Sequence, residues 1–594
     1  MAKAALPSWD LSDLYKGISD PSISRDIKRA RQLAAAFEKS HKGMVQKLDA
    51  KALGEAIAAY DSLSDLLGRI GSYAQLVYAA NMMDAEIAQF YQNSSEALTD
   101  ISAHTLFFAL ELNKISDKKL EAMSGLSKEL DRYWPWIREV RAYRAFQLSD
   151  ELEQILHDKH VTGRSAWSRL FDETIAKLDF VIDGKKLSSA EAMHCLSSPK
   201  PEMRKAAAKV IGRVFGQHAH VFALITNTLA KDKDIEDRWR GFAKPISSRN
   251  VSNQVEDKVV EALISTVEKN YPNLAHRYYA LKARWFGQKK LDYWDRNAPL
   301  PGKDESSYQW EEARAIVLES YAAFSPELAK IGRQFFDKNW IDVPVRTGKS
   351  PGAFAHPTVP SAHPYLLVNF QGKTRDVMTL AHELGHGVHQ VLSAQQGALM
   401  SDTPLTLAET ASVFGEQLVF QEILRREKKA SRRKVLIASK VEDMLNTVVR
   451  QIAFCEFERR VHDERKQGEL TVARLGEIWL AIQKESLGPS IRFAPEYAHY
   501  WTYIPHFIHS PFYVYAYAFG DCLVNSLYAI YQKEVQAGHA KQFEKKYLEM
   551  LRTGGTLRHK ELLAPFGIDI SKPAFWQEGL NIISGYIDQL EAMA

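Results

Sequence analysis

The 594-residue chain has few cysteines, little glycine and proline, and almost no excess of one charge. Its three cysteines lie far apart and form no CxxC pair, which excludes a disulfide scaffold and a thiolate metal cluster. Glycine (31) and proline (22) are both below average usage, which argues against a loop-rich or all-β chain. The formal net charge is only +4, so charge gives no indication of a nucleic-acid partner.

Long apolar runs and an N-terminal targeting segment are also missing. No stretch of about 18 apolar residues occurs, and the densest one, 512–519, is far too short to span a bilayer. No apolar core precedes the first acidic residues, so we expect no secretory signal. Together with the unpaired cysteines, these features predict a soluble cytoplasmic protein with no membrane partner.

What the chain does contain is helical periodicity over most of its length. Apolar residues recur at three- and four-residue steps, for example in 27–60, as expected for amphipathic helices. One region breaks the pattern, because residues 342–372 are rich in glycine, proline and serine. Within it, the apolar and aromatic run 365–370 is typical of a strand. The sequence therefore predicts a mainly α fold that contains a small β-sheet.

A metal-binding pattern follows the predicted strand. His382, Glu383 and His386 form HExxH on a helical stretch, so both imidazoles leave one helix face a turn apart. That spacing lets two ring nitrogens reach one ion at about 2.0–2.1 Å. Glu383 would lie beside the ion and act as general base on a water. Gly385 and Gly387 interrupt this helix, which suggests that another backbone or a ligand approaches, or simply that helices pack closely.

The sequence also offers a third metal ligand, as catalytic zinc requires. The longer pattern HExxHxxGxxH is excluded, since His389 and Leu392 stand where it needs Gly and His. We therefore expect a carboxylate from a second helix. Glu409 is the first candidate, because an unpaired carboxylate is unfavourable in its Ala- and Leu-rich surroundings. Glu416 would share its helix face, either hydrogen-bonded to a ligand histidine or as a plain surface residue, and Asp402 fits a helix cap better than a ligand.

Farther along, residues 503–520 combine tyrosines and histidines with apolar neighbours. An aromatic stripe of this kind is more often part of a core. Buried Tyr hydroxyls usually need partners, however. A Tyr O–H or His N–H aimed at the metal would stabilise a developing oxyanion.

These motifs resemble those of the oligoendopeptidase F group of zinc peptidases, relatives of thimet oligopeptidase. The resemblance covers nearly the whole chain and is carried by residues 9–14, 348–354, 368–370, 382–386, 408–412, 457–462 and 504–515. It implies a multi-helical, hinged clam-shell peptidase with a deep channel and a small β-sheet next to the HExxH helix. Residues 1–200 would form an N-terminal helical region, part of the channel wall and lid, and residues 201–594 the catalytic domain.

The resemblance also implies a metal site. One zinc ion per chain would be held by His382, His386 and Glu409, with Glu383 as the base. His389, three residues after the second ligand, would pack or support a ligand rather than bind the ion.

The resemblance further extends to the aromatic stretch. His506 and Tyr513 match the pattern of the group, and Tyr517 stands where a transition-state tyrosine is expected. His509 and Tyr515 are possible substitutes for these three.

The sequence thus predicts a zinc-dependent endopeptidase that cleaves short unstructured peptides. The strand at 365–370 would pair with the peptide by β-augmentation. One alternative is a carboxypeptidase or dipeptidyl carboxypeptidase of the same helical HExxH type. Another is a non-catalytic peptide-binding protein with a structural metal, which Glu383 and an open fourth position argue against. Mn²⁺ or Co²⁺ could also serve as the working metal.

Overall fold

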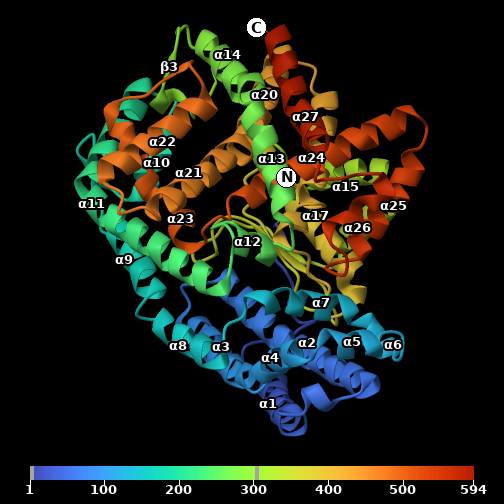
Figure 1. Ribbon diagram of the computed structural model, residues 1–594. Coiled ribbons are helices and arrows are strands. Elements are labelled where there is room, and N and C mark those ends of the chain that lie inside the picture. The colour runs from blue at the N-terminus through green and yellow to red at the C-terminus, as the bar shows by residue number, and fades with distance from the viewer. Residues whose placement is uncertain (1–5, 301–306, 594) are drawn as a thin grey trace. The chain divides into compact units, whose positions relative to one another are not determined.

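The computed structural model describes residues 6–300 and 307–593. The chain is 71% helical with few small sheets (Figure 1), which confirms the predicted mainly α fold. Its contacts divide it into two compact units. Unit 1 comprises Met1–Arg144, Glu305–Arg426 and Ile530–Asp569, and unit 2 comprises Ala145–Asp304, Glu427–Ala529 and Ile570–Ala594. Each unit therefore combines three separate segments, and the functional division expected at residue 200 stays a prediction.

Unit 1 begins with a group of antiparallel helices. The run 64–113 forms a helical hairpin, because Asp84 accepts hydrogen bonds from the N–H groups of Glu86 and Ile87 and starts a new helix. The helices are α1 (Pro21–His41), α2 (Ala50–Ala80), α3 (Ala85–Ala103), α4 (Leu106–Lys114), α5 (Asp117–Met123), α6 (Lys128–Arg132) and α7 (Trp134–Ala142).

The later segments of unit 1 hold the HExxH motif. They contain α15 (Trp310–Phe324), α16 (Pro326–Asp337), α17 (Thr374–Ser393), α18 (Leu405–Ala408), α19 (Ser412–Arg426), α25 (Ala540–Arg552) and α26 (His559–Leu563). The motif lies in α17, which contacts α16, α19 and α25. The predicted helix around HExxH is therefore confirmed.

A three-stranded sheet lies next to α17 in the order β4-β6-β5. β6 (Tyr365–Leu367) pairs with β4 (Ile341–Asp342) in parallel and with β5 (Phe354–His356) in antiparallel orientation. The strand prediction is confirmed for its first half. The prediction that this strand pairs with a peptide is wrong, because both of its edges are already paired. Within the described residues β5 pairs with one strand only, β6, so its other edge carries no strand, and β5 lies next to α17.

The buried side chain of Lys349 fixes the loop that leads to β5. Its Nζ donates hydrogen bonds to the carbonyl oxygens of Val368 (2.6 Å), Pro344 (3.0 Å) and Asp342 (3.1 Å), and lies 3.2 Å from the Asp342 carboxylate. Burial of an ammonium group is tolerated only with such partners. Lys349 therefore joins the loop to the ends of β4 and β6.

Unit 2 is built around the 40-residue helix α11. Its elements are α8 (Asp150–His160), α9 (Arg164–Ala176), β1 (Phe180–Ile182), β2 (Lys185–Leu187), α10 (Ser189–His194), α11 (Pro201–Arg240), α12 (Ser247–Ser252), α13 (Asp257–Asn270), α14 (Arg277–Trp285), β3 (Leu291–Asp292), α20 (Ala430–Thr447), α21 (Val449–Arg465), α22 (Val472–Leu487), β7 (Ile491–Arg492), α23 (His506–His509), α24 (Tyr515–Gln536) and α27 (Pro573–Ala592). The chain passes into unit 1 within α24.

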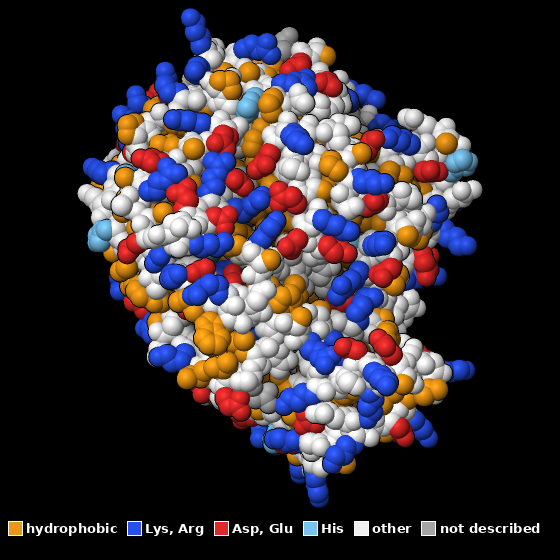
Figure 2. Space-filling model, viewed as in Figure 1, with side chains coloured by type: hydrophobic (Ala, Val, Ile, Leu, Met, Phe, Trp, Pro, Cys, Tyr) orange, Lys and Arg blue, Asp and Glu red, His pale blue; other side chains and the backbone are white. Residues whose placement is uncertain are grey.

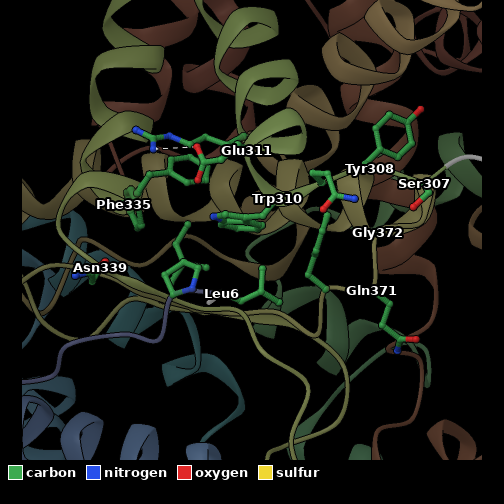
Figure 3. A pocket seen from close by; sticks show the side chains of 15 residues that line it. Leu6, Ser307, Tyr308, Trp310, Glu311, Phe335, Asn339, Gln371 and Gly372 are labelled. Carbon is green, nitrogen blue, oxygen red and sulfur yellow. Dashed lines mark hydrogen bonds and ion pairs between the residues drawn. The ribbon is translucent and has the colours of Figure 1, made fainter. Parts of the chain in front are cut away.

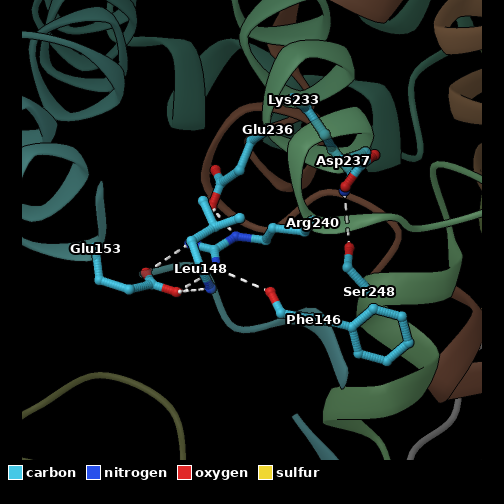
Figure 4. A network of polar contacts seen from close by, with 8 residues as sticks. All are labelled: Phe146, Leu148, Glu153, Lys233, Glu236, Asp237, Arg240 and Ser248. Atoms are coloured by element: carbon cyan, nitrogen blue, oxygen red, sulfur yellow. Dashed lines mark hydrogen bonds and ion pairs between the residues drawn. The ribbon is translucent and has the colours of Figure 1, made fainter. Parts of the chain in front are cut away.

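A polar network fixes the C-terminal end of α11 (Figure 4). Arg240 forms ion pairs of 2.7 Å with Glu153 and Glu236 and donates a hydrogen bond to the carbonyl of Phe146. These contacts join α11 to α8 and to the segment before it.

The surface has no one-sided charge on the face drawn in Figure 2, where Lys and Arg alternate with Asp and Glu. This agrees with the small net charge of the sequence. None of the described helices combines the length and the apolar character that a membrane span needs.

Candidate active site

The three predicted metal ligands meet at one point of unit 1. The Nε2 atoms of His382 and His386 lie 3.1 Å apart, and Oε2 of Glu409 lies 3.4 Å and 3.5 Å from them. Among the residues that the structure describes, this is the one group of His, Cys, Asp or Glu whose atoms could together hold an ion.

The spacing of these atoms fits a tetrahedral ion. Ligands at about 2.0–2.1 Å from zinc lie about 3.3 Å from one another in that geometry. The three measured distances cluster around that value. Burial lowers the pKa of His386, which favours the neutral ring that metals bind. Two imidazoles and one carboxylate leave a fourth position for water or substrate.

Glu409 does not lie on the continuous helix that the sequence suggested. It ends the short helix α18, and residues 409–411 form a turn before α19 begins at Ser412. The Ser412 hydroxyl donates a 2.6 Å hydrogen bond to the Glu409 carboxylate. Tyr547 of α25 donates a 2.8 Å hydrogen bond to the carbonyl of Thr410. The turn that presents the carboxylate is therefore held from both sides. Asp402 does not cap α18, whose N-cap is Pro404, so that prediction is wrong.

The two glycines of the motif helix make different contacts. A Cβ at Gly385 would lie 2.5 Å from the backbone oxygen of Ala411. A second backbone therefore approaches this glycine, which was one of the two explanations offered by the sequence. A Cβ at Gly387 would meet the ring of Phe335 at 2.7 Å, which is close packing of a side chain. Gly385 thus lets α17 approach the turn that bears Glu409.

Glu416 contacts the ring of His382, a predicted metal ligand. Its Oε1 lies 2.6 Å from Nδ1 of His382, which leaves Nε2 of that ring facing His386 and Glu409. Burial alone would lower the pKa of His382. The hydrogen bond and negative charge of Glu416, together with the negative charge of Glu409, have the larger effect and raise this pKa to about 9. The site therefore attracts positive charge. His389 is buried outside this group, as predicted.

Glu383 lies beside the ligand group with the properties of a base. Its side chain is buried, and burial raises its pKa to about 7 against the opposing effects of the His382 charge and a hydrogen bond from the N–H of Ala355. A carboxyl group that titrates near neutrality can both accept and return a proton. The contact with Ala355 places β5 directly at this carboxylate.

A cavity of about 460 Å³ extends from Glu383 along the sheet. Its lining comes from α17, from the loop before β5 and from the chain after β6: Gly352, Ala353, Val368, Asn369, Phe370, Arg375, Asp376, Thr379 and Glu383. Another cavity of unit 1 is lined by Trp310, Phe335 and Gln371 among others (Figure 3). None of the predicted site residues lines that second cavity, so the candidate site is the one beside Glu383.

The aromatic stretch forms a cluster within unit 2. Nε2 of His506 lies 3.3 Å from the Tyr517 hydroxyl, and the Tyr513 ring packs against both rings with centroids 5.8 Å and 5.2 Å away. All three side chains are partly buried. Of the possible substitutes, Tyr515 is fully buried and accepts a hydrogen bond from Asn253.

The other possible substitute, His509, is exposed and pairs with Asp172 at 2.8 Å. Neither of the two belongs to the cluster.

Comparison with known proteins identifies the family. The profile of peptidase family M3 matches residues 194–582, more than half of the chain, and the profile described as oligopeptidase F matches residues 111–180. The chain belongs to peptidase family M3.

Relatives of this M3 peptidase match it over almost its whole length. It is 24% identical to Oligopeptidase PepF of Bacillus subtilis, across 99% of this chain and 87% of that protein. It is 26% identical to an oligoendopeptidase F homolog of Borreliella burgdorferi, across 98% of this chain and 97% of that protein. Its fold matches the crystal structure of oligoendopeptidase-F from Enterococcus faecium with a TM-score of 0.70 and a sequence identity of 22%. The match covers 96% of this chain and 97% of that chain. The resemblance to the oligoendopeptidase F group is confirmed, and family membership supports peptidase activity.

Several residues at the M3 peptidase site were not singled out from the sequence. Ala355 and Tyr547 act through contacts that involve backbone groups, which leave no pattern in the sequence. Asn369 fixes the cavity wall by donating to the carbonyls of Ser350 and Gly352. The sequence signals for this wall were the Gly-, Pro- and Ser-rich composition of residues 342–372 and the family resemblance at residues 348–354 and 368–370.

Proposed function

We propose that this M3 peptidase is a zinc-dependent endopeptidase that hydrolyses internal bonds of short, unstructured peptides. The observation that carries the proposal is the convergence of His382, His386 and Glu409 at the spacing of a tetrahedral ion, with Glu383 beside them on a cavity. The free edge of β5 next to that cavity supports a peptide as the ligand.

His382, His386 and Glu409 would hold one ion per chain. A divalent ion bound there supplies Lewis-acid chemistry, which acidifies water and polarises the scissile carbonyl. Two imidazoles and a carboxylate with one open position are a common ligand set of catalytic zinc. Glu416 would orient the His382 ring through its Nδ1 hydrogen bond.

Glu383 would remove the proton from the attacking water and later deliver it to the leaving amine. Its pKa of about 7 suits both transfers. A peptide paired with the edge of β5 would be held by main-chain hydrogen bonds, which give affinity without strict sequence choice. Pairing of this kind requires an extended chain, so folded proteins would be poor substrates.

The cluster of His506, Tyr513 and Tyr517 would donate hydrogen bonds to the carbonyl oxygen as negative charge develops. The assignment rests on the resemblance of residues 504–515 to the family, and the 3.3 Å contact between His506 and Tyr517 keeps two of the donors together. The three cysteines are free, which fits a reducing cytoplasm.

The test uses an internally quenched peptide that is blocked at both ends, with the native chain and Glu383→Gln. We expect the native chain to cut inside the peptide and a chelator to stop it, because the ion would be removed. Glu383→Gln should keep its metal, measured by elemental analysis, and lose turnover by orders of magnitude.

The other outcomes separate the alternatives. Cleavage only of peptides with a free C-terminus would indicate a carboxypeptidase or dipeptidyl carboxypeptidase. Peptide binding without any cleavage by the metal-loaded native chain would indicate a binding protein. Turnover retained by Glu383→Gln would remove this residue as the base, and the metal content identifies zinc, manganese or cobalt.

A further inference from the structure

One face of α17 carries more than the proposed base. Arg375, Thr379 and Glu383 follow one another at four-residue steps, and all three line the same cavity. Eight residues of α-helix span about 12 Å, so the backbone positions of Arg375 and Glu383 are the two ends of this row.

The positive charge of Arg375 is not used by the fold. The side chain is exposed and makes no hydrogen bond or ion pair with any residue that the structure describes. The adjacent carboxylate, Asp376, is engaged elsewhere, since it accepts hydrogen bonds from the N–H groups of Gln371 (2.8 Å) and Lys373 (2.9 Å).

Two other arginines of the same segment of unit 1 do have partners. Arg314 pairs with Asp337 at 2.6 Å, and Arg346 pairs with Asp342 at 2.8 Å. Arg375 is thus an unpaired guanidinium at one end of the row that ends at the proposed base.

The walls of the cavity suit an extended peptide. On one side lie Gly352 and Ala353, whose small side chains leave the backbone accessible, and Asn369 holds this wall in place. An extended chain advances about 3.3 Å per residue, so about 12 Å corresponds to three or four residues.

We propose that Arg375 binds a carboxylate of the peptide substrate, three or four residues from the bond that is cut. The inference rests on the proposed function and adds a substrate class to it. Guanidinium groups bind carboxylates through two parallel hydrogen bonds, which fixes position as well as charge. The carboxylate is either the free C-terminus or an Asp or Glu side chain.

The experiment measures kcat and KM on matched quenched peptides, each with one cleavable bond. One series places Glu or Gln three or four residues from that bond on either side, and a second compares a free with an amidated C-terminus at the same distance. The variants are Arg375→Gln and, as the matched control, Lys373→Gln, which removes the same charge two residues away but does not line the cavity.

The native chain should prefer the carboxylate-bearing peptide of one series by about 1.5- to 5-fold in KM, the range of an exposed ion pair. Arg375→Gln should lose that preference, so that its KM for the carboxylate-bearing peptide rises to its KM for the Gln or amidated peptide. Lys373→Gln should keep the preference. The series that responds identifies the source of the carboxylate.

Direct binding gives a readout that does not depend on turnover. In the Glu383→Gln background, Arg375→Gln should weaken binding of the preferred peptide by a similar factor, and added salt should reduce the difference. The inference is overturned if the chain cleaves these peptides and no carboxylate position gives a preference that depends on Arg375. Failure of the native chain to cleave any peptide would instead refute the proposed function.

Discussion

The contact between α17 and the turn of Glu409 leads to a sharp prediction for Gly385→Ala. The added Cβ would lie 2.5 Å from the Ala411 oxygen and 2.6 Å from the Ser412 Cα, whereas ordinary contact begins at 3.4 Å. The turn must therefore move by about 0.9 Å (3.4 minus 2.5). The obstructing atoms are backbone, so a rotamer change cannot relieve the overlap.

The movement affects metal binding more than folding. Overpacking costs about 1–3 kcal/mol, and replacing a helical glycine by alanine returns about 1 kcal/mol, so the net loss of stability is about 0–2 kcal/mol. Metal–ligand distances tolerate only about 0.2 Å. A shift of about 0.9 Å (3.4 minus 2.5) at the turn of Glu409 exceeds that tolerance several-fold. We expect metal affinity to fall by at least the 10–100-fold typical of a disturbed ligand environment.

The assay is competition for the ion with a series of chelators, together with thermal unfolding of the metal-free chain. Gly387→Ala is the matched control, because its new Cβ meets the side-chain ring of Phe335, which can give way. The control should lose some stability and keep its metal. Native metal affinity in a folded Gly385→Ala chain would refute the reasoning that the close approach of α17 sets the position of Glu409.

Three further predictions concern residues that support the site or the fold. Glu416→Ala removes the hydrogen bond to His382 and should lower metal affinity about 10–100-fold. The same competition measures this, and an unchanged affinity would show that Glu416 does not orient the His382 ring. Lys349→Met removes the donor to three carbonyl oxygens and leaves Asp342 paired with Arg346 alone, so the free energy of unfolding should fall by about 1–3 kcal/mol. The measurement is the denaturant midpoint, and an unchanged midpoint would contradict this account. Burial raises the pKa of Glu458 from 4.5 to about 8 in the folded chain. Between these pH values the unfolded chain has lost the proton that the folded chain still holds, so the free energy of unfolding falls as pH rises. Glu458→Gln keeps an acceptor for the Phe512 N–H and should gain stability over the native chain as pH rises from 5 to 8, and a thermal-unfolding difference that does not change with pH would contradict the assignment.

The sequence predicted the parts of the site that depend on spacing within one helix. His382, Glu383 and His386 could be placed because helical geometry alone sets their relation. Glu409 was predicted as a ligand because it is a carboxylate in apolar surroundings, and its Oε2 lies 3.4 Å and 3.5 Å from the two imidazoles. The turn at 409–411 was not foreseen, because nothing in the local residues distinguishes it from a continuous helix.

Features that depend on distant pairing were less accessible. The run 365–370 was recognised as a strand, but which edge stays free is decided by residues 341–342 and 354–356, far apart along the chain. The sequence shows Arg375 near a helix start, but it cannot show that the side chain lines a cavity. Periodicity predicted the helical fold well, since amphipathic faces are a local property.

The hydrogen bond from the Tyr547 hydroxyl to the Thr410 carbonyl affects the order in which parts of the candidate site can form during synthesis. The ribosome makes Glu416 131 residues before Tyr547, an interval of roughly 7–26 s at usual translation rates. Throughout that interval the emerging chain already holds both histidines and the glutamates. The turn at 409–411 then has the hydroxyl of Ser412 but lacks the hydrogen bond from Tyr547. The last segment of unit 1 thus completes the support of the turn that carries Glu409, so the candidate site reaches its final form only when almost the whole chain has been synthesised.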